Sequence, residues 1–241
     1  VYSAYSDITR FARLLNTQVP LPEVVFVGPE SSGKTSLLEA FLGFTFSNGA
    51  PSSRPVYFTL MNNPKLDTPK ITIKRDAANS DFDRDVEVSL SSLGSEIEKR
   101  DSKSQKPVFI TYEWKNCINV TFIDTPGLND DTEETVFEQT KPSHRHIVSV
   151  EGSSAWDDYT NASFIKKVDS DFSRTTFVYT KFQSLLVNLR DVNKYLSNIL
   201  PDCKTFFVTM LSSGVRSKFS EEDQFKQKIW QAYRRDIDTL N

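Results

Sequence analysis

The sequence predicts an α/β fold with a mainly parallel central sheet flanked by helices. Short apolar runs of strand type recur along its 241 residues, and stretches with apolar residues at helical spacing lie between them. One of the apolar runs leads through a glycine-rich loop directly into a helical stretch, as in a βα unit. The chain is long enough for one large α/β domain or two small ones.

The most informative segment follows the first predicted strand, at residues 24–27. Residues 28–35 read Gly-Pro-Glu-Ser-Ser-Gly-Lys-Thr, which fits the P-loop pattern G-x-x-x-x-G-K-[ST], and residues 36–42 are predicted to form a helix. In such a loop, backbone N–H groups and the positive end of the helix hold phosphates. Lys34 is expected to reach the β- and γ-phosphates, and Thr35 to bind Mg²⁺. The alternative is an ordinary glycine turn between a strand and a helix.

The remaining elements follow from the same patterns. Apolar or alternating runs predict strands at 56–60, 70–74, 108–112, 120–123, 147–150, 176–179 and 205–208, with a tight turn near Lys115 between the third and fourth of these. Helices are predicted at 2–16, 91–100, 157–169, 188–199 and 221–240. The polar residues 75–84 and 127–143 receive no predicted element.

Composition restricts the classes of protein and partner. The net charge is −3, and a quarter of the residues are charged, so nothing indicates binding to nucleic acid. Cys117 and Cys203 match no metal-binding spacing, and so few cysteines favour a reducing compartment such as the cytosol. No apolar run has the length of a membrane span.

A second motif, Phe-Ile-Asp-Thr-Pro-Gly at 122–127, ends another predicted strand. The carboxylate of Asp124 can hold the water shell of Mg²⁺. The N–H of Gly127 can meet the γ-phosphate, and losing that contact on hydrolysis would make the loop a switch. Without the P-loop upstream, the motif could equally be a simple turn.

A third motif, Thr-Lys-Phe-Gln at 180–183, stands where a GTPase carries its guanine-reading sequence N/T-K-x-D. The stem of Lys181 can pack on the base. Gln183 replaces the aspartate that accepts two guanine N–H groups, and its carbonyl lacks the charge for this. A weaker guanine preference is therefore expected. The alternative is a strand end with a solvated lysine.

Ser-Ser-Arg-Pro at 52–55 completes a set of motifs that resembles the dynamin superfamily of GTPases. The set comprises the P-loop followed by L-L-E-A-F-L-G, a variant of the Thr-Arg-Arg-Pro switch I, D-T-P-G-L and T-K-x-x, at intervals similar to those of dynamins. The resemblance covers the chain from about residue 15 to residue 240. Segments 150–156, 168–169 and 173–175 are most similar to plant and algal dynamins of the plastid-division and cytokinesis branch.

The resemblance implies an extended dynamin-type G domain of the P-loop NTPase class at 21–215. It also implies an N-terminal helix at 1–20 and a C-terminal helix at 216–241 in a bundle signalling element, with the stalk absent. Both terminal helices could instead simply pack on the domain. Expected partners are guanine nucleotide, a homodimer through the G domains, and homo-oligomers on a membrane in the full-length protein. A cytoplasmic protein recruited to an organelle surface, the plastid division site, is implied.

The resemblance also implies roles for particular residues. The expected catalytic residues are Glu30, Ser31, Lys34, Ser52 and Gly127. The expected metal ligands are Thr35, Ser52 and, through water, Asp124. The expected nucleotide contacts are Gly28, Ser32, Gly33, Lys34, Thr35, Ser36, Arg54, Asp124, Thr180, Lys181, Gln183, Thr209 and Met210.

Three departures from the family pattern qualify these roles. Glu30 stands in place of the catalytic glutamine, Ser52 replaces the switch threonine but keeps its hydroxyl, and Gln183 replaces the guanine-reading aspartate. In addition, Thr209-Met210 stands where the family has Asn-Arg. The expected function is GTP hydrolysis with Mg²⁺ on dimerisation, in the service of organelle division. The alternative is a nucleotide-regulated assembly module with weak or no hydrolysis and relaxed base specificity.

Overall fold

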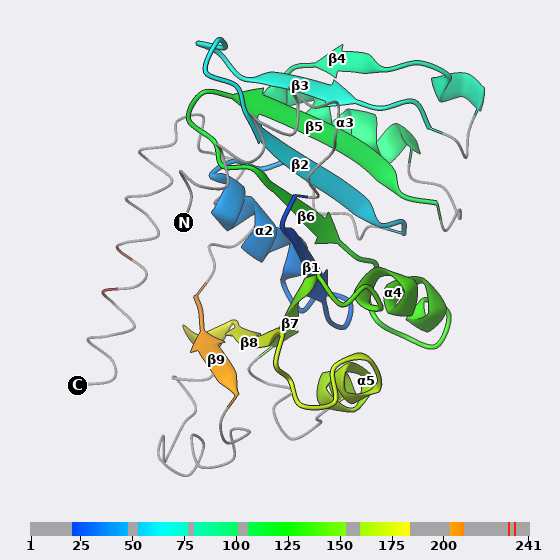
Figure 1. Ribbon diagram of the computed structural model, residues 1–241, viewed down its shortest axis with the longest axis vertical. Helices are drawn as coiled ribbons and strands as arrows, with labels where there is room; N and C mark the ends of the chain where they lie inside the picture. The colour runs from blue at the N-terminus through cyan, green and yellow to red at the C-terminus, as the bar shows by residue number, and fades with distance from the viewer. Residues whose placement is uncertain are drawn as a thin grey trace.

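The computed structural model describes residues 21–47, 53–76, 80–100, 106–152, 160–183 and 203–209, together with 231 and 234. Their core is a nine-stranded sheet in the order β4-β3-β5-β2-β6-β1-β7-β8-β9 (Figure 1). The strands are β1 (Glu23–Val27), β2 (Val56–Asn62), β3 (Lys70–Ile73), β4 (Val86–Val88), β5 (Val108–Trp114), β6 (Val120–Asp124), β7 (His146–Gly152), β8 (Thr175–Thr180) and β9 (Lys204–Phe207). The helices are α2 (Lys34–Leu42), α3 (Leu90–Arg100), α4 (Glu133–Thr140) and α5 (Thr160–Val168), with a 3₁₀ turn η1 (Ser80–Phe82).

The sheet combines a parallel half with a mixed half. Strands β6, β1, β7, β8 and β9 are parallel neighbours. Beyond them, β2 is antiparallel to β6 and parallel to β5. At the far edge, β3 is antiparallel to β5, and β4 is antiparallel to β3. The predicted α/β fold with a mainly parallel sheet is therefore confirmed.

The position of β2 could not be expected from the short turn between β5 and β6. Those two strands are not neighbours, because β2 lies between them. The residues of β2 suit an interior strand, since Val56, Phe58 and Leu60 are buried on one face and Tyr57 packs into the apolar cluster on the other.

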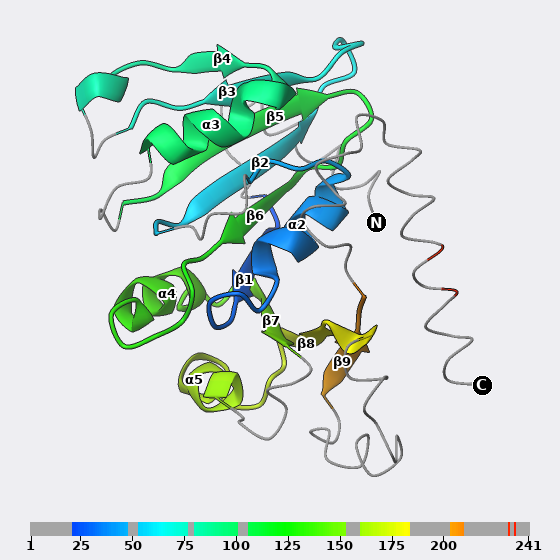
Figure 2. The ribbon, with the colours of Figure 1, turned by 180° about the vertical axis from the view of Figure 1, so that it is seen from behind.

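Helices cover both faces of the sheet, and alternate residues of β1 divide the core between them. Phe26 joins the cluster that contains Leu38 of α2 and Leu93 of α3. Its neighbours along the strand, Val25 and Val27, belong to the cluster formed with α4 and α5. Figure 2 shows α2 and α3 on the same side of the sheet.

Two elements lie in segments for which no element was predicted. Strand β4 has only three residues, too few for a periodic pattern. Helix α4 reads E-E-T-V-F-E-Q-T, and its acidic residues conceal a buried stripe that includes Val136 and Gln139. The predicted strands within the described ranges and the helices at 36–42, 91–100 and 157–169 are found with small shifts at their ends. The helices predicted at 2–16, 188–199 and 221–240 lie outside the described residues, and among those described no helix is long and apolar enough to cross a membrane.

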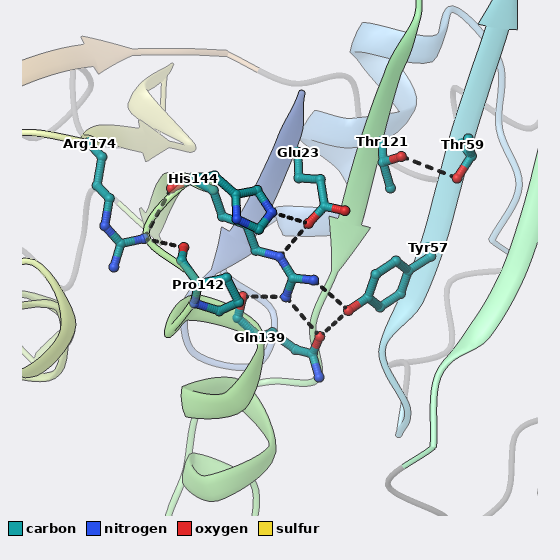
Figure 3. A network of polar contacts seen from close by, with 9 residues as sticks. Glu23, Tyr57, Thr59, Thr121, Gln139, Pro142, His144 and Arg174 are labelled. Carbon is teal, nitrogen blue, oxygen red and sulfur yellow. Dashed lines mark hydrogen bonds and ion pairs between the residues drawn. The ribbon is translucent and has the colours of Figure 1, made fainter. Parts of the chain in front are cut away.

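A polar network holds the amino-terminal end of β1 to the carboxyl end of α4 (Figure 3). Arg145 donates to the carboxylate of Glu23 at 2.5 Å, to the main-chain carbonyl of Gln139 at 2.8 Å and to the hydroxyl of Tyr57 at 3.2 Å. The Tyr57 hydroxyl also donates to the side chain of Gln139, and His144 contacts Glu23 at 3.2 Å. These contacts fix the carboxyl end of α4 at the edge of the sheet opposite the P-loop, which follows the other end of β1.

Candidate nucleotide-binding site

The P-loop and the D-T-P-G loop leave the sheet side by side. Strands β1 and β6 are parallel, with Phe26 opposite Asp124, so both loops emerge from carboxyl ends at the same edge of the sheet. The hydroxyl of Thr125 donates to the carbonyl of Phe26 at 2.7 Å and ties the second loop to the first strand. In open α/β sheets, this carboxyl edge is where ligands bind.

The start of the P-loop passes very close to β7. A Cβ placed on Gly28 would lie 2.0 Å from the carbonyl oxygen of Val150, so only glycine fits there. Ser31 adopts a positive φ of 59°, and Gly33 then precedes the first residue of α2. The loop is thus held in the strand–loop–helix arrangement that the sequence predicts, and the alternative of an ordinary turn gains no support.

Lys34 points its ammonium group into the loop. Its side chain is buried, and Nζ donates to the carbonyls of Gly28 at 2.9 Å and Pro29 at 2.8 Å. Burial lowers the pKa of Lys34, whereas the negative charges of Asp124 and Glu30 raise it. The arrangement places a cation behind the loop that is expected to bind phosphate.

Thr35 and Asp124 form the polar centre of the site. The hydroxyl of Thr35 donates to Oδ2 of Asp124 at 2.7 Å. Asp124 is fully buried, and this raises its pKa to about 6 despite the nearby charge of Lys34. Within the described residues, Oδ1 of Asp124 and Oγ of Ser32 are buried without a hydrogen-bond partner. Free carboxylate and hydroxyl oxygens are the ligands that Mg²⁺ prefers, so these residues fit that ion.

The D-T-P-G loop rests directly on the P-loop. A Cβ on Gly127 would lie 2.8 Å from both N and Cα of Glu30, and the N–H of Leu128 donates to the carbonyl of Gly28 at 2.9 Å. Thr132, just before α4, donates its hydroxyl to the carbonyl of Gly127 at 2.5 Å. The two loops are therefore in direct contact.

The end of β8 lies against the other side of the P-loop. The hydroxyl of Thr180 donates to the carbonyl of Ser32 and to that of Glu151, the latter at 3.2 Å. Beyond it, Lys181 is exposed with a positive φ of 58°. Gln183 has a buried Oε1 that lacks a hydrogen-bond partner in the described part of the chain. The third motif thus adjoins the phosphate loop, as a base-reading segment must.

The expected site residues other than Arg54 fall into three groups. Those brought together at the carboxyl edge of the sheet are Gly28, Glu30, Ser31, Ser32, Gly33, Lys34, Thr35, Ser36, Asp124, Gly127, Thr180, Lys181 and Gln183. Thr209 comes two residues after β9, which pairs with β8. Ser52 and Met210 lie outside the described residues.

Arg54 does not have the role that the sequence suggests. Its guanidinium is 1% exposed and pairs with both carboxylate oxygens of Asp76, at 2.6 and 2.9 Å. It also donates to the main-chain carbonyls of Arg100 at 2.6 Å and Lys106 at 2.7 Å. A buried group with these partners stabilises the fold, so the expectation of a nucleotide contact is corrected here.

Glu39 is a residue near the site that sequence reasoning missed. It lies on α2 and is 2% exposed, and one carboxylate oxygen accepts from the N–H groups of Phe46 and Ser47, at 3.0 and 2.9 Å, and from the Ser47 hydroxyl at 2.8 Å. The sequence did offer a signal, because Glu39 is an acidic residue between apolar neighbours of a helix. A carboxylate buried among such neighbours needs hydrogen-bond partners.

Comparison with known proteins gives a consistent result. The profile of the dynamin family matches residues 24–182. The chain is 38% identical to Dynamin-like protein A of Dictyostelium discoideum, in an alignment that covers 100% of this chain and 31% of the relative. It is 32% identical to Dynamin-like protein B of that organism and 28% identical to Dynamin-like protein ARC5 of Arabidopsis thaliana, over 100% of this chain and 35% and 36% of those relatives. The chain thus spans about a third of the length of these relatives.

Proposed function

This chain belongs to the dynamin family, and we propose that it is a GTPase domain that binds a guanine nucleotide with Mg²⁺ and hydrolyses GTP on dimerisation. The observation that carries the proposal is the meeting of Lys34, Thr35 and Asp124 at the carboxyl edge of β1 and β6. A buried cation suits the phosphates of a nucleoside triphosphate, and a hydroxyl beside a partly unpartnered carboxylate suits its metal ion.

The residues divide the work between them. The N–H groups from Ser31 to Ser36 hold the phosphates, and Lys34 adds a point charge toward the β- and γ-phosphates. Thr35 and Ser52 offer hydroxyl oxygens to Mg²⁺, and Asp124 accepts from its water shell. When bound, Mg²⁺ supplies the positive charge that offsets the charge of the phosphates.

The attacking water requires positioning by groups close to the γ-phosphate. Gly127 lies against the backbone of Glu30, and the carboxylate of Glu30 can accept a hydrogen bond from water. Its negative charge beside the γ-phosphate opposes the reaction, so we expect slower hydrolysis than a glutamine there would give. Contacts across the nucleotide face of a second copy would hold Glu30 and Ser31, both exposed in this chain, in place.

For the whole protein, we propose a role in the division of an organelle, with the plastid as the first candidate. The similarity of segments 150–156 and 173–175 to the plastid-division and cytokinesis branch supports this assignment. The full-length protein would be recruited from the cytoplasm to the organelle surface and would assemble there as a homo-oligomer on the membrane.

A second candidate function is a nucleotide-regulated assembly module with weak or no turnover. Two residues favour it, because Glu30 places a charge beside the γ-phosphate and Gln183 lacks the charge that reads guanine. Binding of nucleotide would then act only by shifting the chain between conformations.

Phosphate release from GTP and ATP, measured over a range of protein concentrations, separates the two functions. If the chain is a GTPase, the rate of phosphate release from GTP per protomer should rise with protein concentration. Light scattering should then show a dimer with GDP–aluminium fluoride and a monomer with GDP. Nucleotide binding without turnover at any concentration would favour the module. Preference for ATP would overturn the assignment of the base.

A further inference from the structure

The two ends of the P-loop are both tied to consecutive residues of β7. At its start, Gly28 packs so closely on the main-chain carbonyl of Val150 that a Cβ would lie 2.0 Å from the oxygen. At its end, the carbonyl of Ser32 accepts from the hydroxyl of Thr180. That hydroxyl also lies 3.2 Å from the carbonyl of Glu151, the residue that follows Val150. The position of the loop is therefore linked to that of these two residues at the carboxyl end of β7.

Asn161, the second residue of α5, contacts both of these β7 residues. Its Nδ2 donates to the carbonyl of Val150 at 3.2 Å, and its backbone N–H donates to the carboxylate of Glu151. Asn161 is 1% exposed and Glu151 is 6% exposed, so water does not compete for either contact. Figure 1 shows α5 beside the end of β7. The start of this helix thus holds the main chain on which the P-loop packs.

The amide of Asn161 is not explained by stability alone. Its Oδ1 is buried without a hydrogen-bond partner among the described residues, and so is Oγ of Ser149, on the same face of β7 as Glu151. Burying an amide oxygen without a partner is unfavourable, and an apolar side chain at this position would avoid the cost. The amide cannot turn round, because Oδ1 would then face the carbonyl of Val150. What the amide provides is therefore the donor to the carbonyl on which Gly28 packs.

We propose that Asn161 and Glu151 are positioning residues, which hold the carboxyl end of β7 where it supports both ends of the P-loop. The inference rests on the proposed function, in which that loop binds the phosphates of a guanine nucleotide. GDP and GTP both place phosphates on the loop, so a displaced loop weakens the binding of both. The ground state and the transition state lose binding alike, so the Kd for GDP and the KM for GTP rise while kcat changes little.

Paired variants separate positioning from stability. Asn161→Leu keeps the approximate size of the side chain but removes both Nδ2 and the unpaired oxygen, and Asn161→Ala removes the same groups together with the bulk. Glu151→Gln keeps an oxygen that can accept from the N–H of Asn161, whereas Glu151→Leu removes every acceptor. Ser163→Ala is the matched control, because it changes an exposed residue two positions further along α5.

The decisive measurement is the Kd for GDP beside KM and kcat for GTP. We expect Asn161→Leu, Asn161→Ala and Glu151→Leu to raise Kd and KM about tenfold while kcat changes less than about threefold. Glu151→Gln should lose less affinity than Glu151→Leu, and Ser163→Ala should match the wild type.

Thermal unfolding distinguishes positioning from a merely structural role. The midpoint for Asn161→Leu should stay within about 3 °C of the wild type, because removal of the unpaired oxygen offsets the lost hydrogen bond. A structural role predicts the reverse, a lower midpoint with unchanged GDP affinity. Wild-type GDP affinity in folded Asn161→Leu and Asn161→Ala, or a fall in kcat as large as the rise in KM, would overturn the positioning role.

Hydrogen exchange without nucleotide separates a failure of this inference from a failure of the proposed function. The N–H of Leu128 donates to the carbonyl of Gly28 at 2.9 Å, and that of Ser32 to the carbonyl of Pro29 at 3.3 Å, so both amides report on the P-loop. We expect both to exchange about fivefold faster or more in Asn161→Leu than in the wild type and Ser163→Ala. Wild-type protein that binds no guanine nucleotide would refute the proposed function, and the faster exchange would still support the positioning role. Identical exchange in the wild type and Asn161→Leu would overturn that role.

Discussion

The phosphate side and the base side of the site are built in different ways. On the phosphate side, Gly28 approaches Val150 so closely that a Cβ would lie 2.0 Å from its carbonyl oxygen, and buried Lys34 bonds to two loop carbonyls. On the base side, Lys181 is exposed, and Gln183 holds a buried oxygen without a partner in the described residues. On the proposed assignment of the two sides, phosphate binding would depend on backbone shape, whereas base recognition would depend on side chains that can change one at a time.

Matched lysine variants test this difference and should give the largest effect. We expect Lys34→Ala to weaken both GTP and GDP binding by about 100-fold or more, because a phosphate charge is lost. Lys181→Ala removes only packing against a base and should cost about tenfold or less. Isothermal titration calorimetry with both nucleotides checks this, and equal losses in the two variants would contradict the division into sides.

Gly127→Ala should slow the reaction without removing the nucleotide. The added Cβ would lie 2.8 Å from the backbone of Glu30, so either the D-T-P-G loop or the P-loop must shift. We expect kcat for GTP to fall about 30-fold while GDP affinity changes only a few-fold. Asp130→Asn changes an exposed residue in the same connection between β6 and α4, and it serves as the control in single-turnover assays. A normal rate for Gly127→Ala would show that the two loops do not act together.

On the base side, Gln183→Asp should sharpen recognition. An aspartate can accept two guanine N–H groups, so we expect the ratio of GDP to ADP affinity to rise about tenfold. Calorimetry with both diphosphates measures that ratio. Gln183→Asn is the control, because it shortens the side chain equally without adding charge. A ratio that stays constant would show that guanine is read elsewhere.

The last expected effect is on stability and concerns Glu151, which lies between the two sides. Burial raises its pKa to about 7, above the ordinary value of 4.5. The folded chain therefore holds a proton that the unfolded chain releases, and stability falls as pH rises from about 4.5 to about 7. Glu151→Gln should remove this loss and gain up to about 3 kcal/mol at pH 8 but little at pH 4.5. Chemical denaturation at the two pH values measures the gain, and an equal gain at both would contradict a titrating Glu151.

Local motifs explain how much of this arrangement could be predicted from the sequence. The strand–loop–helix around the P-loop and the end of β6 were placed correctly because each pattern is contiguous and strongly apolar. Helix α4 was missed because its polar residues hide the stripe at Val136. The place of β2 between β5 and β6 depends on pairing across the sheet, which a short turn at Lys115 does not reveal.

The wrong expectation for Arg54 has the same origin. Its position beside Ser52 in the sequence suggested the nucleotide, but its partners Asp76, Arg100 and Lys106 lie 22, 46 and 52 residues away. Contacts of that separation arise only when β3, α3 and β5 assemble, and no local pattern records them. Glu39 was overlooked likewise, because the sequence marks it only as an acidic residue among apolar neighbours, and the backbone groups that it binds are identified only by the fold.

The insertion of β2 between β5 and β6 also has a consequence for how the chain is made. A ribosome adds roughly 5–20 residues per second, and the end of β2 lies 46 residues before the start of β5, the first of its neighbours to be made. For several seconds after β2 emerges, neither of its neighbours in the sheet has been synthesised. Its apolar residues, including Phe58, are then exposed on an unpaired strand, so this is the stretch of the nascent polypeptide that a chaperone would bind.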